Sequence, residues 1–293
     1  MKMKIIKLLT FFFAHYWPIL ANSTSIDKPI PLTIWVHGTK LTPTIAFANF
    51  FYKMPGMNAA TAYDEKYHKR TIANLLCELD PKRYLLENFY FFGWNGKLCF
   101  TEREKASKDL YHALLQLASN YEVLYHKKPT FRIIAHSHGG NVVLNLAKVQ
   151  SPEQPIVIDE LILLCCPVQE ETKHYIANDC FKRVYAFYSS KDMFQIIDPQ
   201  GLYKNSRAKK TFSERRFNDH DKLRQARIQM KGKSLMHIDF LCTPFLMHLS
   251  SLCDQIEHFY ETIILNQKSY EKIIDIKMEK NGTVQFHKKL KAI

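Results

Sequence analysis

The sequence contains no internal repeat, no low-complexity tract and no cysteine pairs at the spacing of a zinc site, which excludes repeat architectures and zinc ribbons. What is present has the balance of an ordinary globular protein, with 46% hydrophobic and 24% charged residues. A chain of 293 residues is long enough to bury a large core, as one domain or as two smaller ones.

The cysteines provide no disulfide framework, because seven is an odd number and no spacing requires a bridge. Cys165 and Cys166 stand side by side in an apolar run and are interpreted as core residues. One disulfide could form among Cys180, Cys242 and Cys253.

The net charge of +13 is unevenly distributed along the chain. The segment Gly201–Lys233 holds eleven Lys or Arg against three acidic residues. No RNA-binding or DNA-binding motif accompanies this segment, so a nucleic-acid partner is not expected. We interpret it as a basic surface loop, with contact to an anionic membrane surface as the second interpretation.

The first residues have the pattern of a signal peptide. Lys2, Lys4 and Lys7 precede the apolar run Leu8–Phe13, and Ala21 is a candidate cleavage position. Residues 1–21 therefore predict an exported protein, whether secreted, periplasmic or associated with the envelope. An uncleaved anchor, or a plain helix on a cytoplasmic protein, is the alternative, although the run is short for a membrane span.

Apolar segments alternate with segments of helical periodicity through most of the chain. Strands are predicted at Ile30–Gly38, Glu87–Trp94, Thr130–Ser137, Asp159–Pro167, Arg183–Asp192 and Gln225–Gly232. Helices are predicted over residues 43–53, 103–124, 140–149 and 240–265, and a loop-rich section over 53–82. This order predicts an α/β fold with a mostly parallel sheet and helices on both faces, whose functional residues lie at the carboxyl ends of the strands.

The last thirty residues have a different pattern. Asn281-Gly282 stands between two alternating segments, which predicts a β-hairpin. We therefore expect a main domain over residues 28–265 and a carboxyl-terminal extension over 266–293 that forms a small β appendage.

The third predicted strand ends in Ala-His-Ser-His-Gly, and a helical pattern begins at once. Ser137 is therefore either a helix cap or a nucleophile. A nucleophilic serine needs a base, a group that orients the base, and donors for the oxyanion. A strained strand–serine–helix turn also needs small residues two positions before and after, which Ala135 and Gly139 supply.

This stretch resembles the nucleophile elbow of the α/β-hydrolase superfamily, Gly-x-Ser-x-Gly, with the alanine that some lipases carry in the first position. The first strand ends in Trp-Val-His-Gly-Thr, which resembles the family's His-Gly oxyanion loop. By position, the resemblance implies that Thr39 and His138 supply the backbone N–H groups of an oxyanion hole. His37 is interpreted as a residue that stabilises the turn, and Gly38 as a site of close backbone approach.

The family's chain order is nucleophile, acid, histidine. Asp192 lies just beyond the fifth strand, where the resemblance implies the acid, and Asp198 is the alternative. His237, in the loop before the last helix, is the predicted base, whereas His248 is an alternative base inside the helical pattern.

The resemblance implies a lipase-like or esterase-like serine hydrolase that cleaves a carboxylic ester, expected to be a lipid, through an acyl-enzyme. Ser137, His237 and Asp192 would form the triad, and neither a metal nor an organic cofactor is required. A thioesterase or an acyltransferase would use the same triad. The alternative from another class is a catalytically idle hydrolase-fold protein with a binding or envelope role.

Overall fold

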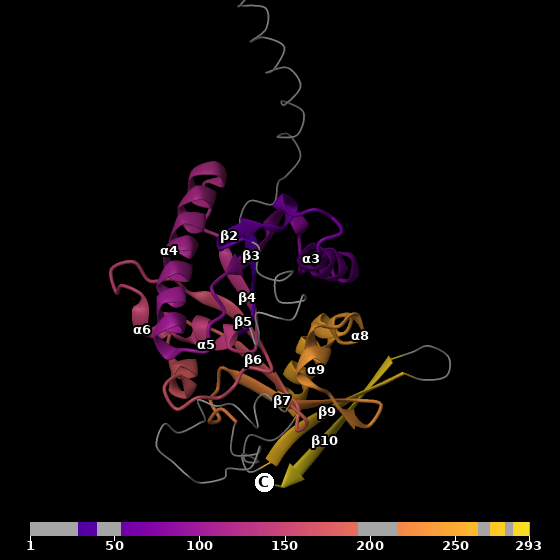
Figure 1. The fold of residues 1–293 in the computed structure, drawn as a ribbon. Helices are drawn as coiled ribbons and strands as arrows, with labels where there is room; N and C mark the ends of the chain where they lie inside the picture. Colours follow the sequence, from indigo (N-terminus) through magenta and orange to yellow (C-terminus); the bar gives the residue numbers. More distant parts are fainter. Residues whose placement is uncertain (1–28, 40–53, 193–215, 263–269, 279–283, 293) are drawn as a thin grey trace, which may run out of the picture.

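The computed structural model describes residues 29–39, 54–192, 216–262, 270–278 and 284–292 (Figure 1). The strands are β1 (Pro31–Val36), β2 (Gly56–Ala59), β3 (Phe89–Gly93), β4 (Thr130–His136), β5 (Ile158–Leu164), β6 (Val184–Tyr188), β7 (Leu223–Met230), β8 (Lys233–Ser234), β9 (Tyr270–Met278) and β10 (Val284–Ala292). The α-helices are α3 (His68–Leu79), α4 (Phe100–Tyr125), α5 (Gly139–Leu144), α6 (Leu146–Val149), α8 (Thr243–Leu246) and α9 (Leu249–Thr262), and short 3-10 helices include η6 (His237–Leu241). The predicted signal peptide and the helix predicted over 43–53 lie outside the described residues.

These strands form one sheet in the order β10-β9-β7-β6-β5-β4-β1-β3-β2, with β8 paired to β7. From β3 to β9 every neighbouring pair is parallel. The pairs β2–β3, β9–β10 and β7–β8 are antiparallel. The predicted mostly parallel sheet is confirmed, and it places the ends of β1, β4, β5, β6 and β7 along one edge.

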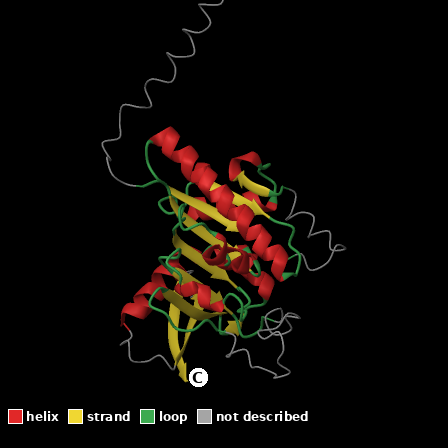
Figure 2. Cartoon of the chain, turned by 90° about the vertical axis from the view of Figure 1, so that its left-hand side faces the viewer, coloured by secondary structure: helices red, strands yellow, loops and turns green. Residues whose placement is uncertain are grey.

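Helices cover both faces of the sheet because successive strand residues point to opposite sides. On β1, Leu32, Ile34 and Val36 join the core that contains the buried face of α4, whereas Trp35 joins the core that contains α3 and α9. Figure 1 shows α4 and α5 on one side of the sheet and α3, α8 and α9 on the other. In Figure 2 the long helix α4 lies across the strands.

Two regions differ from the sequence prediction. The section expected to be loop-rich contains β2 and the 12-residue α3, whose Ile72 and Leu76 are one turn apart and buried against the sheet. The single helix expected over 240–265 is divided into η6, α8 and α9. Pro244 lies in the first turn of α8, where its missing N–H is tolerated, so it starts a new helix instead of continuing one.

The predicted carboxyl-terminal hairpin is confirmed as β9 and β10, but it is part of the main sheet and not a separate appendage. β9 pairs with β7 in parallel, with Arg227 opposite Ile273 and Met230 opposite Ile276. Ile273, Ile274 and Ile276 are buried in that position. Burial of these isoleucines on both faces of β9 therefore makes the hairpin part of the core.

All seven cysteines are free thiols, so the disulfide considered among Cys180, Cys242 and Cys253 is absent. Among the helices of the described ranges, none has both the length and the apolar character needed to cross a bilayer.

Candidate active site

A serine occupies the sharp turn between β4 and α5. Ser137 has a backbone φ of 55°, in the left-handed region that glycine adopts most readily. Its N–H donates to the carbonyl of Leu164 at the end of β5, with N and O 2.8 Å apart. A non-glycine residue in this conformation costs of order 1–3 kcal/mol, and such strain is concentrated at functional sites.

Two glycines allow the turn after β1 to lie against this serine. A Cβ atom on Gly38 would lie 2.6 Å from Ser137 Cβ and 3.2 Å from Ser137 Oγ. A Cβ atom on Gly139 would lie 2.5 Å from the carbonyl oxygen of His37. Both positions require glycine because the backbones come close, and this brings the β1 turn to the serine hydroxyl.

The imidazole of His37 holds the β1 turn together. The Trp94 backbone N–H donates to His37 Nε2 at 3.1 Å, and the Trp94 indole N–H donates to the His37 carbonyl at 2.8 Å. Because Nε2 accepts, the neutral ring carries its proton on Nδ1, which lies 2.7 Å from the Gly38 carbonyl oxygen. Both ring nitrogens are occupied by backbone groups, which is a structural arrangement and not that of a catalytic base.

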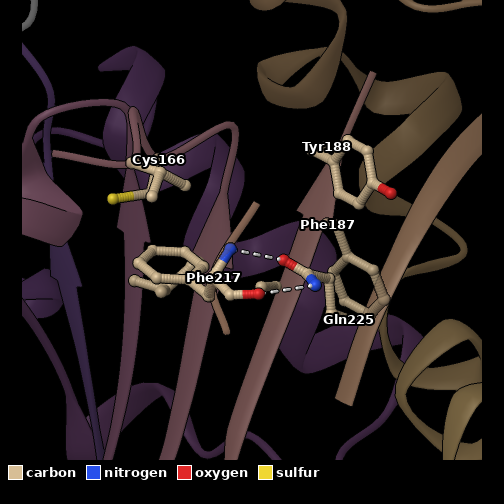
Figure 3. Close-up of a pocket in the computed structure, with 8 residues that line it drawn as sticks. Cys166, Phe187, Tyr188, Phe217 and Gln225 are labelled. Carbon is tan, nitrogen blue, oxygen red and sulfur yellow. Dashed lines mark hydrogen bonds between the residues drawn. The ribbon is translucent and has the colours of Figure 1, made fainter. Parts of the chain in front are cut away.

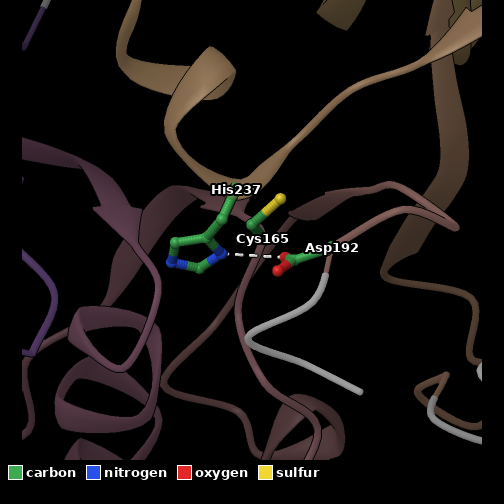
Figure 4. A group of neighbouring side chains, drawn as sticks. All are labelled: Cys165, Asp192 and His237. Atoms are coloured by element: carbon green, nitrogen blue, oxygen red, sulfur yellow. Dashed lines mark hydrogen bonds and ion pairs between the residues drawn. The ribbon is translucent and has the colours of Figure 1, made fainter. Parts of the chain in front are cut away.

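Asp192 follows β6, His237 begins η6, and their side chains meet in the interior (Figure 4). The distance between His237 Nδ1 and Asp192 Oδ2 is 2.8 Å, and the exposed fractions are 6% for His237 and 0% for Asp192. The carboxylate accepts a hydrogen bond from Nδ1–H, which sets the tautomer and orientation of the ring and leaves Nε2 as the basic nitrogen. The pair has the geometry of the acid and base of a Ser-His-Asp triad.

His136 connects the His237 loop to the serine turn. Its Nε2 lies 3.2 Å from the His237 carbonyl oxygen, and the two imidazole ring centroids are 4.6 Å apart. Burial, with a smaller effect of the neighbouring His237, holds the pKa of His136 well below its usual value. The ring is therefore neutral and donates from Nε2, so the residue preceding Ser137 fixes the loop that carries His237.

The alternative base, His248, lies in another part of the fold. Its ring packs edge-on against Phe286 of β10, with ring centroids 6.3 Å apart, and burial lowers its pKa. The alternative acid, Asp198, lies outside the described residues. The structure thus pairs Asp192 with His237.

Thr39 and His138 lie on the two turns that Gly38 and Ser137 bring into contact. His138 Nδ1 lies 3.4 Å from the side-chain amide nitrogen of Asn141, and that amide also donates to the Pro167 carbonyl at 2.9 Å. The role of Thr39 and His138 as oxyanion donors stays a prediction.

Several residues that support the site had no individual signal in the sequence. The Ser189 hydroxyl donates to the Leu235 carbonyl at 2.5 Å, and the hydroxyls of Ser190 and Ser234 are 2.9 Å apart. These two contacts join the end of β6, just before Asp192, to the segment that leads into His237. Ser-Ser after a strand is compatible with any turn, so only the structure identifies these contacts.

Cys165 is the other unforeseen neighbour of the site. Its Sγ and the ligand-type atoms of Asp192 and His237 all lie within 4.8 Å of one another. Thiolate, carboxylate and imidazole are metal ligands, but burial first, and then the charge of Asp192, raise the pKa of the Cys165 thiol well above its usual value. A protonated thiol is a poor metal ligand, and Asp192 and His237 are already in hydrogen-bond contact with each other.

A small pocket lies next to Cys166 (Figure 3). Its lining includes Cys166, Phe187, Tyr188 and Phe217, and Gln225 exchanges two hydrogen bonds with the Phe217 backbone, at 3.0 and 3.3 Å. A Cβ atom on Gly140 would lie 2.4 Å from Cys166 Sγ. Cys166 therefore separates the start of α5 from this mainly apolar pocket.

A mostly parallel sheet in which β1 is the third strand from one edge, with a strained serine between its neighbour β4 and a helix, has the arrangement of the α/β-hydrolase fold. Asp192 follows β6, and His237 follows β7 and the short β8. The fold therefore places the candidate site at the carboxyl edge of the sheet.

No protein-family model matches the sequence, and no curated protein matches it either. Solved structures with a similar arrangement include lipase B of Aspergillus fumigatus, at 12% identity and a TM-score of 0.43 over 79% of this chain. Carboxyl esterase 2 of Tuber melanosporum has 12% identity and a TM-score of 0.41, over 80% of this chain and 76% of its own. An esterase of Pyrobaculum calidifontis has 11% identity and a TM-score of 0.39, over 80% of this chain and 78% of its own. The chain spans 53% of the length of the Aspergillus lipase.

Proposed function

We propose that the protein is a serine hydrolase that cleaves carboxylic esters. The observation that carries the proposal is the buried 2.8 Å contact between His237 Nδ1 and Asp192 Oδ2, linked through His136 to the strained turn of Ser137. A serine that only caps a helix does not require a carboxylate–imidazole pair beside it. Such a pair is costly to bury, because burying a charged group costs free energy unless the group is paired.

The chemistry follows from the position of each group. His237 Nε2 takes the proton of the Ser137 hydroxyl while Oγ forms a bond to the ester carbonyl carbon. The resulting oxyanion is held by the backbone N–H groups of Thr39 and His138. When the intermediate collapses, the bond to the alcohol oxygen breaks and His237 returns the proton to it. Water then repeats the sequence on the acyl-enzyme and releases the acid.

Labelling with a fluorophosphonate probe tests the nucleophile. The wild type is expected to be labelled, and Ser137→Ala is expected to lose the label completely. A folded wild type that resists the probe would favour the idle binding protein. Equal labelling of Ser137→Ala would mean that another residue is the nucleophile.

Comparison of two histidine variants tests the base. On a short p-nitrophenyl ester, we expect His237→Ala to lower kcat by at least about a thousandfold, as removal of a triad member does in serine hydrolases. The matched change His248→Ala should retain wild-type kcat to within a few-fold. The opposite ranking would transfer the role of base to His248.

We further propose that the ester is a lipid presented at a surface. Met236 and Ile238, on either side of His237, are 58% and 51% exposed, and Met247, which directly follows α8, is 42% exposed. Lys191 and Lys233, on the adjacent segments, are exposed as well. Exposed apolar side chains with cationic side chains nearby are typical of contact with an anionic lipid surface.

A thioesterase or an acyltransferase would use the same triad. The rate of turnover of acyl-thioester substrates, compared with that of acyl-ester substrates, distinguishes a thioesterase from an esterase.

A further inference from the structure

The first residue after β5 has an unusual backbone for its type. Cys165 has a φ of 51°, in the left-handed region, and its N–H donates to the Phe187 carbonyl with N and O 2.9 Å apart. Glycine adopts this conformation without the steric cost that a cysteine incurs. A cysteine at this position therefore carries a conformational cost that a glycine would avoid.

That side chain points into the candidate site. Figure 4 shows the Cys165 thiol beside the contact between Asp192 and His237. The residue is completely buried, and its Sγ lies within 4.8 Å of both the carboxylate oxygen and the imidazole nitrogen. Cys166, the next residue, has its Sγ on the opposite side, against Gly140 and the pocket of Figure 3.

The state of the thiol determines what it can do there. Burial first, and then the charge of the Asp192 carboxylate, raise its pKa well above the usual value, so the group is S–H at neutral pH. The other titratable groups near the thiol are Cys166 and Asp239. A protonated, fully buried thiol is neither a nucleophile nor a metal ligand, but it is a hydrogen-bond donor, and an ionised carboxylate has about four acceptor positions.

We propose that Cys165 is a positioning residue whose S–H donates to the Asp192 carboxylate and holds it in line with His237 Nδ1. The proposal rests on the serine hydrolase function proposed above. Asp192 lies four residues beyond the end of β6, and its N–H donates to the Ser189 carbonyl with N and O 3.3 Å apart. A donor at the end of β5 would hold the carboxylate from a neighbouring strand of the sheet, which is a rigid element.

Three variants of Cys165 separate this role from simple packing. Cys165→Ala removes the donor, and Cys165→Gly removes it while also relieving the positive φ, so the glycine variant is expected to fold even if the alanine variant does not. Cys165→Ser keeps a donor at the same position. Cys253→Ala, in α9, is the matched control, because it also deletes a fully buried thiol.

We expect Cys165→Ala and Cys165→Gly to lower kcat on a p-nitrophenyl ester about tenfold, which is the loss of one hydrogen bond to a charged group, with KM unchanged. A carboxylate that has lost a donor stabilises the imidazolium more strongly, so the acidic limb of the pH profile of kcat/KM should move to higher pH. Cys165→Ser should recover most of the rate. Cys253→Ala should lose thermal stability without moving the profile.

Three results would overturn the proposal. The first is a wild-type rate and pH profile in Cys165→Gly. The second is a fall in kcat that Cys253→Ala reproduces to the same extent. The third is inhibition of the wild type by Zn²⁺ that Cys165→Ala abolishes, with higher activity in the presence of a chelator, because the thiol would then be a metal ligand. Fluorophosphonate labelling of the wild type is measured alongside, so that a wild type without a reactive serine is recognised as a failure of the hydrolase function itself.

Discussion

At the scale of single residues, the candidate site depends on groups whose protonation is fixed by burial. His136 is neutral because it is buried beside His237, and His37 is neutral because two backbone groups occupy its ring nitrogens. His237 is paired with the carboxylate of Asp192. The three histidines near the Ser137 turn, His37, His136 and His237, are therefore in three different environments.

The neutrality of His136 predicts a pH-dependent stability. Its pKa is near 6.5 in the unfolded chain and well below that in the folded one. Below pH 6.5 the unfolded chain binds a proton that the folded chain does not, so this group makes the free energy of unfolding fall with decreasing pH, by up to about 1.4 kcal/mol per pH unit. In urea titrations between pH 5 and 7.5, His136→Gln should show a shallower dependence than the wild type.

The control for this experiment is His258→Gln, because His258 is on the surface of α9 with 64% of its side chain exposed. It should retain the wild-type dependence on pH. A His136→Gln curve parallel to that of the wild type would contradict the assignment of a neutral buried histidine.

At the scale of elements, the site is assembled from the ends of four strands, and short side-chain contacts align those ends. The buried Ser189 hydroxyl is one of them, since it joins the end of β6 to the segment before His237. The neighbouring Ser190 makes a similar contact, but it is only partly buried.

These two serines predict unequal effects. Ser189→Ala leaves a buried carbonyl without its donor and should lower the free energy of unfolding by about 1–3 kcal/mol. It should also lower kcat on a p-nitrophenyl ester, because Asp192 and His237 lose a common support. Ser190→Ala should stay within about 0.5 kcal/mol of the wild type. Chemical denaturation and kinetics on both variants check this, and equal effects would show that the Ser189 contact has no special weight.

The sequence was sufficient to name the candidate residues that depend on chain order, and the structure pairs two of them, Asp192 and His237. Ser137 could be singled out because the turn requires small neighbours, and Asp192 and His237 because the resemblance places an acid after the fifth strand and a histidine in the loop before the last helix. Cys165 could not, because a cysteine in an apolar run has the same pattern whether it packs in the core or contacts a carboxylate. The partner of β9 could not be predicted either, since alternation indicates a strand but does not say which edge it joins.

At the scale of the whole molecule, a net charge of +13 is combined with exposed apolar groups near the candidate site. The exposed Met236 and Ile238 flank His237, and the exposed Lys191 and Lys233 lie on the adjacent segments. Attraction to an anionic surface and burial of a few apolar side chains are the two contributions that hold peripheral proteins on a bilayer.

Binding to lipid vesicles tests this arrangement. The protein should sediment with vesicles of phosphatidylcholine and phosphatidylglycerol, bind pure phosphatidylcholine more weakly, and dissociate as salt is added. Met236→Ser combined with Ile238→Ser should weaken vesicle binding about tenfold, because two apolar side chains are no longer buried in lipid. Turnover of a dissolved short ester should be unchanged.

The matched control is Val123→Ser with Leu124→Ser. These residues are 71% and 69% exposed, but they lie at the end of α4. If this pair of changes weakens vesicle binding as much as the first pair, the apolar residues beside His237 are not the lipid-binding surface.

The pairing of β9 with β7 has a consequence for the biosynthesis of the chain. β7 leads into the segment that carries His237, and until β9 has left the ribosome one side of β7 is an open edge with unpaired backbone groups. Open edges of this kind recruit strands from other chains. A nascent chain that stalls before β9 would therefore be a target for chaperones and for aggregation, and its vulnerable edge would belong to the strand that leads into the His237 segment.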